Sequence, residues 1–159
     1  MIAVGDHVPD VALKAVTPHG VDDVQTGALL GEGKVVLFGV PGAFTPVCSD
    51  FHLPGFVLRT EDILAKGVAR SFCVSVNDAF VMGAWARSEG ADGITMLADD
   101  TAAFTAAMGL TTDASSFGLG TRSERYAAVI EDGVLVSLEV EQAFVDHEVS
   151  TAEHVLALL

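Results

Sequence analysis

An apolar run that leads directly into a turn and a helix start constrains the fold of this chain more than any other feature. Residues 35–40 (Val-Val-Leu-Phe-Gly-Val) are apolar without alternation, which predicts a strand buried on both faces. After a short turn, Thr45 is a favourable N-cap, and Pro46 suits the first helical position, where its missing N–H costs nothing. The segment therefore predicts a strand–turn–helix unit with Cys48 in the first helical turn.

The position of Cys48 has a chemical consequence. The first turn of a helix presents unpaired backbone N–H groups and the positive end of the helix dipole. Both favour the thiolate of a cysteine over the neutral thiol, and the thiolate is the form that attacks electrophiles. Cys48 is therefore a candidate nucleophile.

Length and composition predict one domain over residues 1–159, because half of the residues are apolar and no linker or repeat divides the chain. Short strand-like runs alternate with helical ones, which predicts an α/β fold with helices around a central sheet. The predicted strands are residues 35–40, 72–76, 94–97, 126–130 and 134–140, the last two joined by an Asp-Gly hairpin turn. The predicted helices are residues 48–65, 78–87, 101–108 and a final helix after residue 150.

Proline, glycine and capping residues predict where these helices begin, bend and end. Pro54-Gly55 should kink or divide the first helix, and Gly67 stands where its C-cap belongs. Asn77 or Asp78 caps the next helix. The pattern Ser150-x-x-Glu153 is a capping box for the last one.

The charge of the chain argues against two classes of partner. There are 22 acidic residues against 8 basic ones, a formal net charge of −14. Lysine and arginine are too few and too scattered for a nucleic-acid surface, and anionic membranes should repel the chain. The longest near-apolar stretch, residues 35–44, is too short to span a bilayer, and the first residues lack a signal-peptide pattern. We therefore expect a cytoplasmic protein.

The segment around Cys48 resembles the active-site region of a known family. Residues 41–49 read Pro-Gly-Ala-Phe-Thr-Pro-Val-Cys-Ser and continue into His-Leu-Pro-Gly-Phe at 52–56. Further matches follow in family order at residues 75–82, Trp85, residues 97–99 and residues 122–126. The chain thus resembles type II (atypical, peroxiredoxin-5-like) peroxiredoxins from about Val4 to about Val140.

This resemblance implies a thioredoxin-like fold with a central mixed sheet, and a thiol peroxidase that reduces hydrogen peroxide and alkyl hydroperoxides without a bound cofactor. Cys48 would attack a peroxide oxygen and become a sulfenic acid. The resemblance favours a catalytic hydroxyl for Thr45; the alternative is a plain N-cap, and the two roles are compatible. Pro41 and Gly42 would belong to the substrate-binding turn, with Pro41 shielding the thiolate. The alternative for Pro41 is a proline that only ends the strand.

A cation near the sulfur is the next requirement, and the sequence offers two neighbouring arginines. Arg125 opens the strand 126–130, so its side chain should share a sheet face with Ala127 and Val129. The resemblance places the catalytic arginine directly before this strand, which favours Arg125. Arg122 lies in a predicted loop and is either a supporting or a solvated residue.

His52 stands four residues after Cys48 and so shares its helix face. A general base of a cysteine hydrolase is one interpretation. The resemblance favours a histidine that lines the edge of the substrate pocket and supports the active-site loop. The other histidines have no metal-ligand spacing, so we predict no metal site.

The second cysteine, Cys73, lies within a predicted strand, where a cysteine is usually a small buried hydrophobe. The resemblance leaves open that it is a resolving thiol. The chain has no cysteine near its C-terminus. We therefore expect an external thiol to reduce the sulfenic acid, glutathione with glutaredoxin first and thioredoxin second.

Other functions remain open at this level. A redox sensor or interaction protein would use oxidation of Cys48 as a signal without turnover. The resemblance also implies a homodimer.

Overall fold

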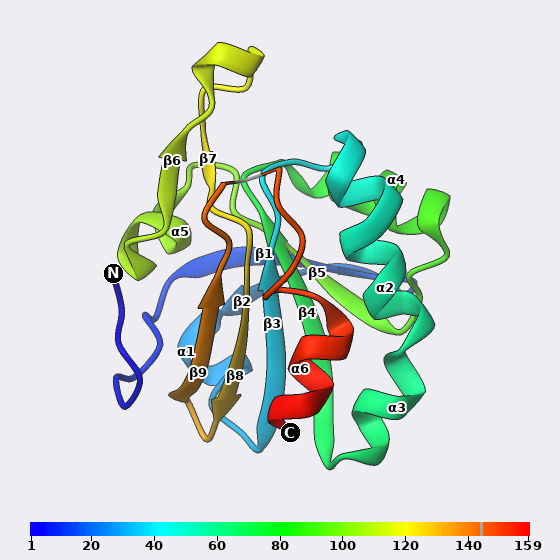
Figure 1. Ribbon diagram of the computed structural model, residues 1–159, viewed down its shortest axis with the longest axis vertical. Coiled ribbons are helices and arrows are strands. Elements are labelled where there is room, and N and C mark those ends of the chain that lie inside the picture. Colours follow the sequence, from blue (N-terminus) through cyan, green and yellow to red (C-terminus); the bar gives the residue numbers. More distant parts are fainter. Residues whose placement is uncertain (144) are drawn as a thin grey trace.

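The computed structural model describes residues 1–143 and 145–159, and Figure 1 shows a central sheet with helices on both faces. The sheet has seven strands in the order β2-β1-β5-β4-β3-β8-β9. They are β1 (Ala12–Thr17), β2 (Gly20–Gln25), β3 (Lys34–Gly39), β4 (Val68–Ser75), β5 (Ile94–Ala98), β8 (Tyr126–Glu131) and β9 (Val134–Val140). A separate two-stranded ribbon joins β6 (Thr111–Asp113) to β7 (Thr121–Ser123) around the short 3-10 helix Ser115–Phe117.

The strand pairing is mixed, as expected. β3, β4 and β5 run parallel to one another. On one side of this group β8 pairs antiparallel with β3, and on the other side β1 pairs antiparallel with β5. β3 lies between β4 and β8, which confirms that the apolar run before the turn is a central strand. Its C-terminal end lies beside the beginning of β8, where Gly39 pairs with Tyr126.

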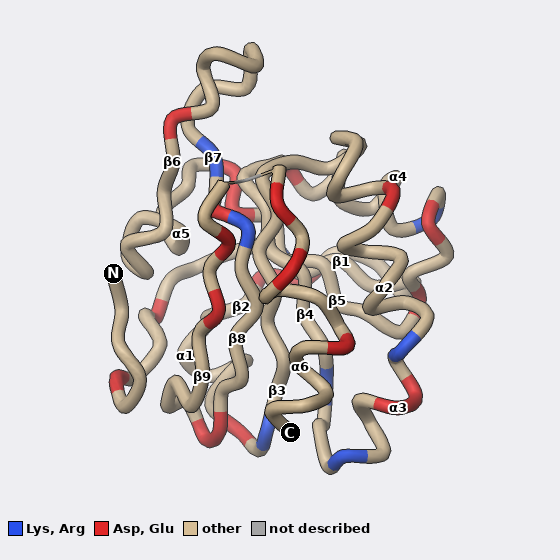
Figure 2. Tube along the Cα trace, viewed as in Figure 1, with Lys and Arg blue, Asp and Glu red and all other residues tan. Residues whose placement is uncertain are grey.

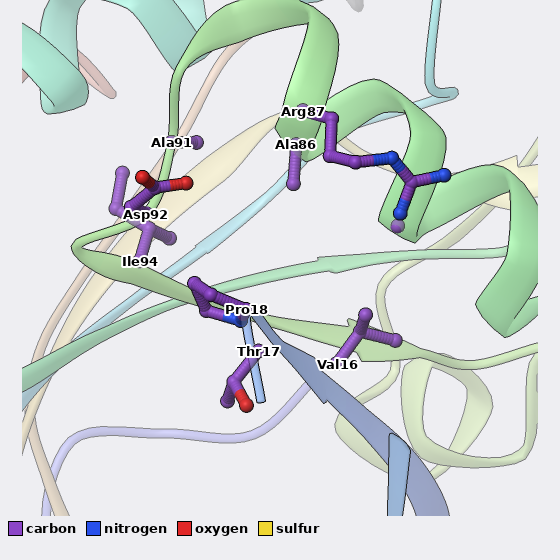
Figure 3. A pocket seen from close by; sticks show the side chains of 9 residues that line it. Val16, Thr17, Pro18, Ala86, Arg87, Ala91, Asp92 and Ile94 are labelled. Atoms are coloured by element: carbon purple, nitrogen blue, oxygen red, sulfur yellow. The ribbon is translucent and has the colours of Figure 1, made fainter. Parts of the chain in front are cut away.

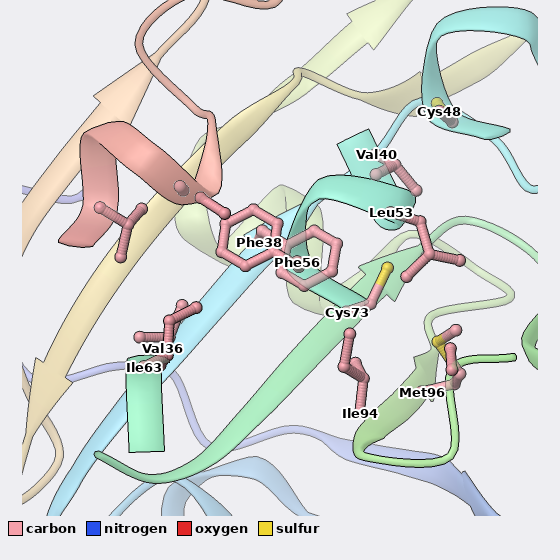
Figure 4. Packing of buried hydrophobic residues seen from close by; sticks show 14 of the residues in the cluster. Val36, Phe38, Val40, Cys48, Leu53, Phe56, Ile63, Cys73, Ile94 and Met96 are labelled. Atoms are coloured by element: carbon pink, nitrogen blue, oxygen red, sulfur yellow. The ribbon is translucent and has the colours of Figure 1, made fainter. Parts of the chain in front are cut away.

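Two cores explain why β3 shows no alternation of apolar and polar residues. One face carries Val36 and Phe38 and is covered by α2 (Leu53–Leu58), α3 (Thr60–Ala65), α4 (Ala79–Glu89) and α6 (Ala152–Leu158). Figure 4 shows this cluster, with Phe38 and Phe56 stacked at 4.0 Å between ring centroids. The other face carries Val35 and Leu37 and is covered by α1 (Thr26–Leu29) and α5 (Ala103–Met108). Both faces are therefore buried, which removes any need for polar residues along the strand.

The helix expected over residues 48–65 is divided differently from the prediction. It begins at residue 46, passes through a π-helical turn at Cys48–His52, and continues as α2 and α3. The Leu53 N–H donates to the Cys48 carbonyl, one residue further back than in an α-helix. Pro54 has no N–H to donate one turn back, so the change of helix type lies beside it. The division itself falls at Arg59 rather than at Pro54-Gly55, since α2 runs through both residues.

Other boundary residues follow the prediction with one correction. Asp78 caps α4 by accepting from the Val81 N–H at 2.8 Å, and Gly67 follows α3 with φ of 87°. The last helix is capped by Thr151, whose hydroxyl accepts from the His154 N–H, and not by Ser150. Ser150 is instead completely buried and bonded elsewhere.

The close approach of β8 makes Gly39 a sharp test of this packing. A Cβ at Gly39 would lie 2.2 Å from Cε1 of Tyr126, whose ring is completely buried. Gly39→Ala should therefore lower the free energy of unfolding by about 1–3 kcal/mol, as overpacked cores do. Gly55, inside α2, has nothing within 4 Å of an added Cβ. Gly55→Ala should raise stability by about 0.5–1 kcal/mol. Urea unfolding measures the stability of both variants. A Gly39→Ala variant with the wild-type free energy of unfolding would contradict the register of β3 against β8.

Candidate active site

Cys48 lies where the sequence predicted, at the beginning of the helical segment that follows β3. Helical structure starts at Pro46, and the Thr45 carbonyl accepts from the Ser49 N–H at 2.9 Å. The Cys48 side chain is completely buried and belongs to the core on the α2 face of the sheet. Figure 4 shows it beyond the end of β3, near Val40.

Arg125 provides the cation that the chemistry needs. Its Nη2 donates to Cys48 Sγ at 3.1 Å, although the two residues are 77 positions apart in the chain. The contact follows from topology, because Arg125 directly precedes β8 and β8 pairs with β3. Only 1% of Arg125 is exposed, so its charge acts on the sulfur with little screening by water.

His52 lies behind Arg125. Arg125 Nη1 donates to His52 Nδ1 at 3.0 Å, and arginine has no acceptor to offer in return. The proton of the imidazole must therefore be on Nε2, which donates to the Ser150 carbonyl at 3.0 Å. Burial, together with the nearby charges of Arg125 and His147, holds the pKa of His52 well below its ordinary value. The ring is neutral, and both of its nitrogens are engaged.

This geometry corrects the expectation for His52. The side chain is completely buried and does not line the pocket that reaches Arg125. A general base for hydrolysis needs a free acceptor nitrogen, and the Nδ1 lone pair is already used by the guanidinium. His52 therefore holds the Arg125 guanidinium in position by accepting its Nη1–H.

A pocket of about 400 Å³ reaches Arg125 and Val47, the residue before Cys48, whereas Cys48 itself is not among the residues that line it. Arg125 and Thr45 contribute its polar groups. Its apolar walls include Phe44, Val47, Phe117 and Val145. Phe117 comes from the segment between β6 and β7, which the sequence did not predict to be a ribbon.

Gly42 and Thr45 form the turn between β3 and the helix. The Gly42 carbonyl accepts from the Thr45 hydroxyl at 2.7 Å and from the Thr45 N–H at 3.3 Å. The hydroxyl proton is thus used, and the remaining lone pair of Oγ1 can accept a hydrogen bond. Pro41 and Gly42 are both buried and lie outside the lining of the pocket. A Cβ on Gly42 would come within 3.1 Å of Thr45 Cγ2, so Gly42 allows the tight turn.

Three further side chains make hydrogen bonds around this turn and Cys48. Asn77, expected as a possible helix cap, accepts from the Ala43 N–H through Oδ1 at 3.0 Å. Arg122, placed in a loop by prediction, lies in β7 and donates to the Val76 carbonyl at 3.0 Å. Trp85 Nε1 donates to the Ser49 hydroxyl at 3.0 Å, beside Cys48. The sequence had left a supporting role for Arg122 open, and no local pattern predicted the bonds that Asn77 and Trp85 make.

Cys73 is completely buried in β4, as expected for a cysteine within a central strand. Burial raises the pKa of its thiol well above the ordinary value, and the nearby Cys48 adds to this effect against a smaller opposing effect of Arg125. Both cysteines are free thiols, and Figure 4 shows Cys73 within the core on β4.

Another pocket lies elsewhere on the molecule. A pocket of about 290 Å³ between β1 and α4, shown in Figure 3, is lined by residues such as Thr17, Arg87 and Asp92. None of the predicted site residues lines it. No three His, Cys, Asp or Glu side chains among residues 1–143 and 145–159 are arranged to hold a metal. Figure 2 shows lysine and arginine scattered along the trace.

Comparison with known proteins gives this geometry a context. The Redoxin family profile matches residues 3–156. The chain is 46% identical to the chloroplastic peroxiredoxin-2E-2 of Oryza sativa subsp. japonica, over 99% of this chain and 72% of that protein. This chain belongs to the peroxiredoxin family. The subclass expected from the sequence, type II, is consistent with these relatives.

Solved peroxiredoxin structures confirm the thioredoxin-like fold. Reduced Prx3 of Vibrio vulnificus in complex with H2O2 superposes with a TM-score of 0.93 at 47% identity, covering 99% of each chain. The oxidised form of that protein gives a TM-score of 0.89 at 48% identity, covering all of both chains. Among the described residues, no helix is both long and apolar enough to cross a membrane.

The two arginines make a matched pair for mutation. Arg125→Ala removes the donor to Cys48, whereas Arg122→Ala removes a donor to backbone carbonyls of the surrounding loops. Loss of a preorganised charged donor costs about 3–4 kcal/mol of transition-state stabilisation, roughly a hundredfold or more in rate. Arg125→Ala should show this loss in stopped-flow oxidation by hydrogen peroxide, and Arg122→Ala a smaller one. A larger defect in Arg122→Ala would exchange their roles.

Proposed function

We propose that Cys48 is the peroxidatic cysteine of a thiol peroxidase that reduces hydrogen peroxide and alkyl hydroperoxides. The observation that carries this proposal is the contact of a buried guanidinium with Cys48 Sγ beside an apolar pocket. Membership of the peroxiredoxin family supports it. The Vibrio vulnificus relative that superposes on this chain was solved with H2O2, which supports hydrogen peroxide as a substrate.

The thiolate sulfur attacks one oxygen of the peroxide, and the O–O bond breaks with its electron pair leaving on the other oxygen. That oxygen takes a proton and departs as water or an alcohol, while Cys48 becomes a sulfenic acid. Negative charge moves from sulfur to oxygen during this step. Arg125 Nη2 already points at the sulfur and can stabilise that charge as it moves.

Thr45 completes the peroxide site in this proposal. Its hydroxyl proton is directed to the Gly42 carbonyl, so Oγ1 offers an acceptor to the pocket that it shares with Arg125. An alkyl hydroperoxide has one O–H to donate and hydrogen peroxide has two; Thr45 Oγ1 would accept from one O–H while Arg125 donates to the oxygens. This pairing of one acceptor with one donor would orient the O–O bond toward the sulfur.

We further propose that an external thiol reduces the sulfenic acid, with glutathione and glutaredoxin as the first choice and thioredoxin as the second. The chain has only two cysteines, and Cys73 is completely buried within a central strand. A disulfide requires Cα atoms within about 7 Å and suitably directed Cβ atoms. Cys48 lies at the beginning of a helical segment, whereas Cys73 lies in β4, which pairs with β3 on one side and β5 on the other. A disulfide between the two cysteines would therefore require local unfolding.

The recycling chemistry balances with two thiols. One glutathione displaces water from the sulfenic acid and forms a mixed disulfide with Cys48. A glutaredoxin thiolate then attacks the glutathione sulfur, releases the Cys48 thiolate, and carries the glutathione away for reduction by a second glutathione. The net reaction consumes one hydroperoxide and two glutathione molecules. With an alkyl hydroperoxide it yields one alcohol, one water and glutathione disulfide, and with hydrogen peroxide it yields two waters and glutathione disulfide.

Association and location are proposed more briefly. Phe44 and Phe117 flank the pocket and are 55% and 60% exposed, which supports the expected homodimer through this face. The cytoplasmic location and the absence of a bound cofactor remain predictions.

Replacement of each cysteine separates their roles. Cys48→Ser should abolish consumption of peroxide, because it removes the thiol to which Arg125 Nη2 donates. Cys73→Ser should keep the first oxidation step, followed through the fluorescence of Trp85, which donates to Ser49 next to Cys48. Peroxide consumption by Cys48→Ser with one equivalent of thiol would show that Cys48 is not the nucleophile.

Intact-mass analysis after one equivalent of peroxide tests the recycling route. The expected product is a Cys48 sulfenic acid that dimedone traps and that glutathione converts to a mixed disulfide. A Cys48–Cys73 disulfide would lose two hydrogens and block both reagents. Its formation as the main product, faster than capture by glutathione, would make Cys73 the resolving thiol.

A further inference from the structure

Glu141 is a buried carboxylate with three donors on one oxygen. Oε2 accepts from the Ser150 N–H at 2.8 Å, the Ser150 hydroxyl at 2.6 Å and the Glu148 N–H at 2.9 Å. Only 5% of the residue is exposed. Burial acts to raise the pKa of this carboxyl, but the hydrogen bonds from Ser150, Glu148 and Val149 outweigh burial and leave the pKa below its ordinary value. The group is therefore an anion at neutral pH, and it holds the end of the segment that precedes α6.

The residue that Glu141 holds is the one that fixes His52. The Ser150 carbonyl accepts from His52 Nε2, and this bond leaves Nδ1 as the acceptor for Arg125 Nη1. If Ser150 moved away, Nε2 would lose its acceptor and the imidazole proton could shift to Nδ1. A proton on Nδ1 would face the guanidinium donor, so the hydrogen bond from Arg125 Nη1 to His52 would be lost.

The backbone of Glu141 closes the connection. Its N–H donates to the Arg125 carbonyl at 2.9 Å, so the same residue is bonded to the main chain of the arginine and to the segment that orients its side chain. The bonds form a ring that runs from Arg125 to Glu141, Ser150 and His52 and back to Arg125. Cys48 is attached to this ring through Arg125 Nη2.

We propose that Glu141 is a positioning residue for peroxide reduction: through Ser150 it selects the Nε2–H tautomer of His52, and that tautomer holds the Arg125 guanidinium on Cys48. The proposal rests on the proposed function of Cys48. Glu141 itself touches neither the sulfur nor the pocket. Its effect on the rate is transmitted by hydrogen bonds.

The experiment compares Glu141→Ala and Glu141→Gln with a control, Glu139→Ala. Glu139 lies on β9, is half-exposed, and faces His154 at 3.8 Å. Two quantities are measured: the second-order rate constant for oxidation of Cys48 by hydrogen peroxide, and the nitrogen-15 shifts of the His52 ring, assigned with His52→Phe. Circular dichroism establishes that each variant is folded.

Glu141→Ala should slow oxidation by at least about tenfold, an effect of the size expected when the hydrogen bonds that orient a reacting group's neighbour are lost. The nitrogen shifts of His52 should move from the pure Nε2–H pattern toward a mixture. Glu141→Gln keeps an acceptor for Ser150, so it should retain most of the wild-type oxidation rate and most of the wild-type His52 shift pattern. Glu139→Ala should match the wild type in rate and in shifts.

A folded Glu141→Ala with the wild-type rate and the wild-type His52 shifts would overturn the proposal. Should that variant fail to fold, Ser150→Ala removes only the hydroxyl bond to Glu141 and should displace the His52 shifts in the same direction. Unchanged shifts and rate in Ser150→Ala would then overturn it. Failure of the wild type to consume peroxide would instead refute the proposed function, and the nitrogen shifts would still report on the ring of hydrogen bonds.

Discussion

The contact between Arg125 and Cys48 is the interaction on which the rest of the site depends. A guanidinium that is 1% exposed carries a large desolvation cost unless its N–H groups are bonded and its charge is compensated. Cys48 Sγ and His52 Nδ1 each accept one of these N–H groups. The buried cation is thus held directly against the Cys48 sulfur, where little water screens its charge.

The fold brings these groups together from three distant parts of the chain. β3 delivers the helix start that carries Cys48, and β8, paired antiparallel with β3, begins just after Arg125. The segment before α6 adds the third part, because Ser150 binds His52 and Glu141 binds Ser150. The pocket lies beside the turn that follows β3, and it is also lined by Arg125, by Val145 and by Phe117 and Leu119 from the segment between β6 and β7. Asn77 holds that turn by accepting from the Ala43 N–H.

The parts of this arrangement that depend on local sequence could be predicted. Thr45, Pro46 and the apolar run before them place Cys48 at a helix start, and alternation along β8 places Arg125 on the correct face. His52 could be placed near Cys48 by helical spacing, but its two partners come from residues 73 and 98 positions away. Glu141 and Ser150 escaped prediction for the same reason: Ser150-x-x-Glu153 resembles a local capping box, and the tertiary bond from Ser150 to Glu141 competes with it. Long-range polar pairing leaves no periodic signal in the sequence.

The central claim is that Arg125 and the pocket beside it make the Cys48 thiolate selectively reactive toward peroxides. The most direct test measures the second-order rate constants of the wild-type protein with hydrogen peroxide and with iodoacetamide, each divided by that of the thiolate of free cysteine. Donors placed for peroxide oxygens should make the peroxide ratio exceed the iodoacetamide ratio by at least about a hundredfold. Equal ratios for the two reagents would contradict the claim, because a thiolate without peroxide-specific stabilisation would then account for the reactivity.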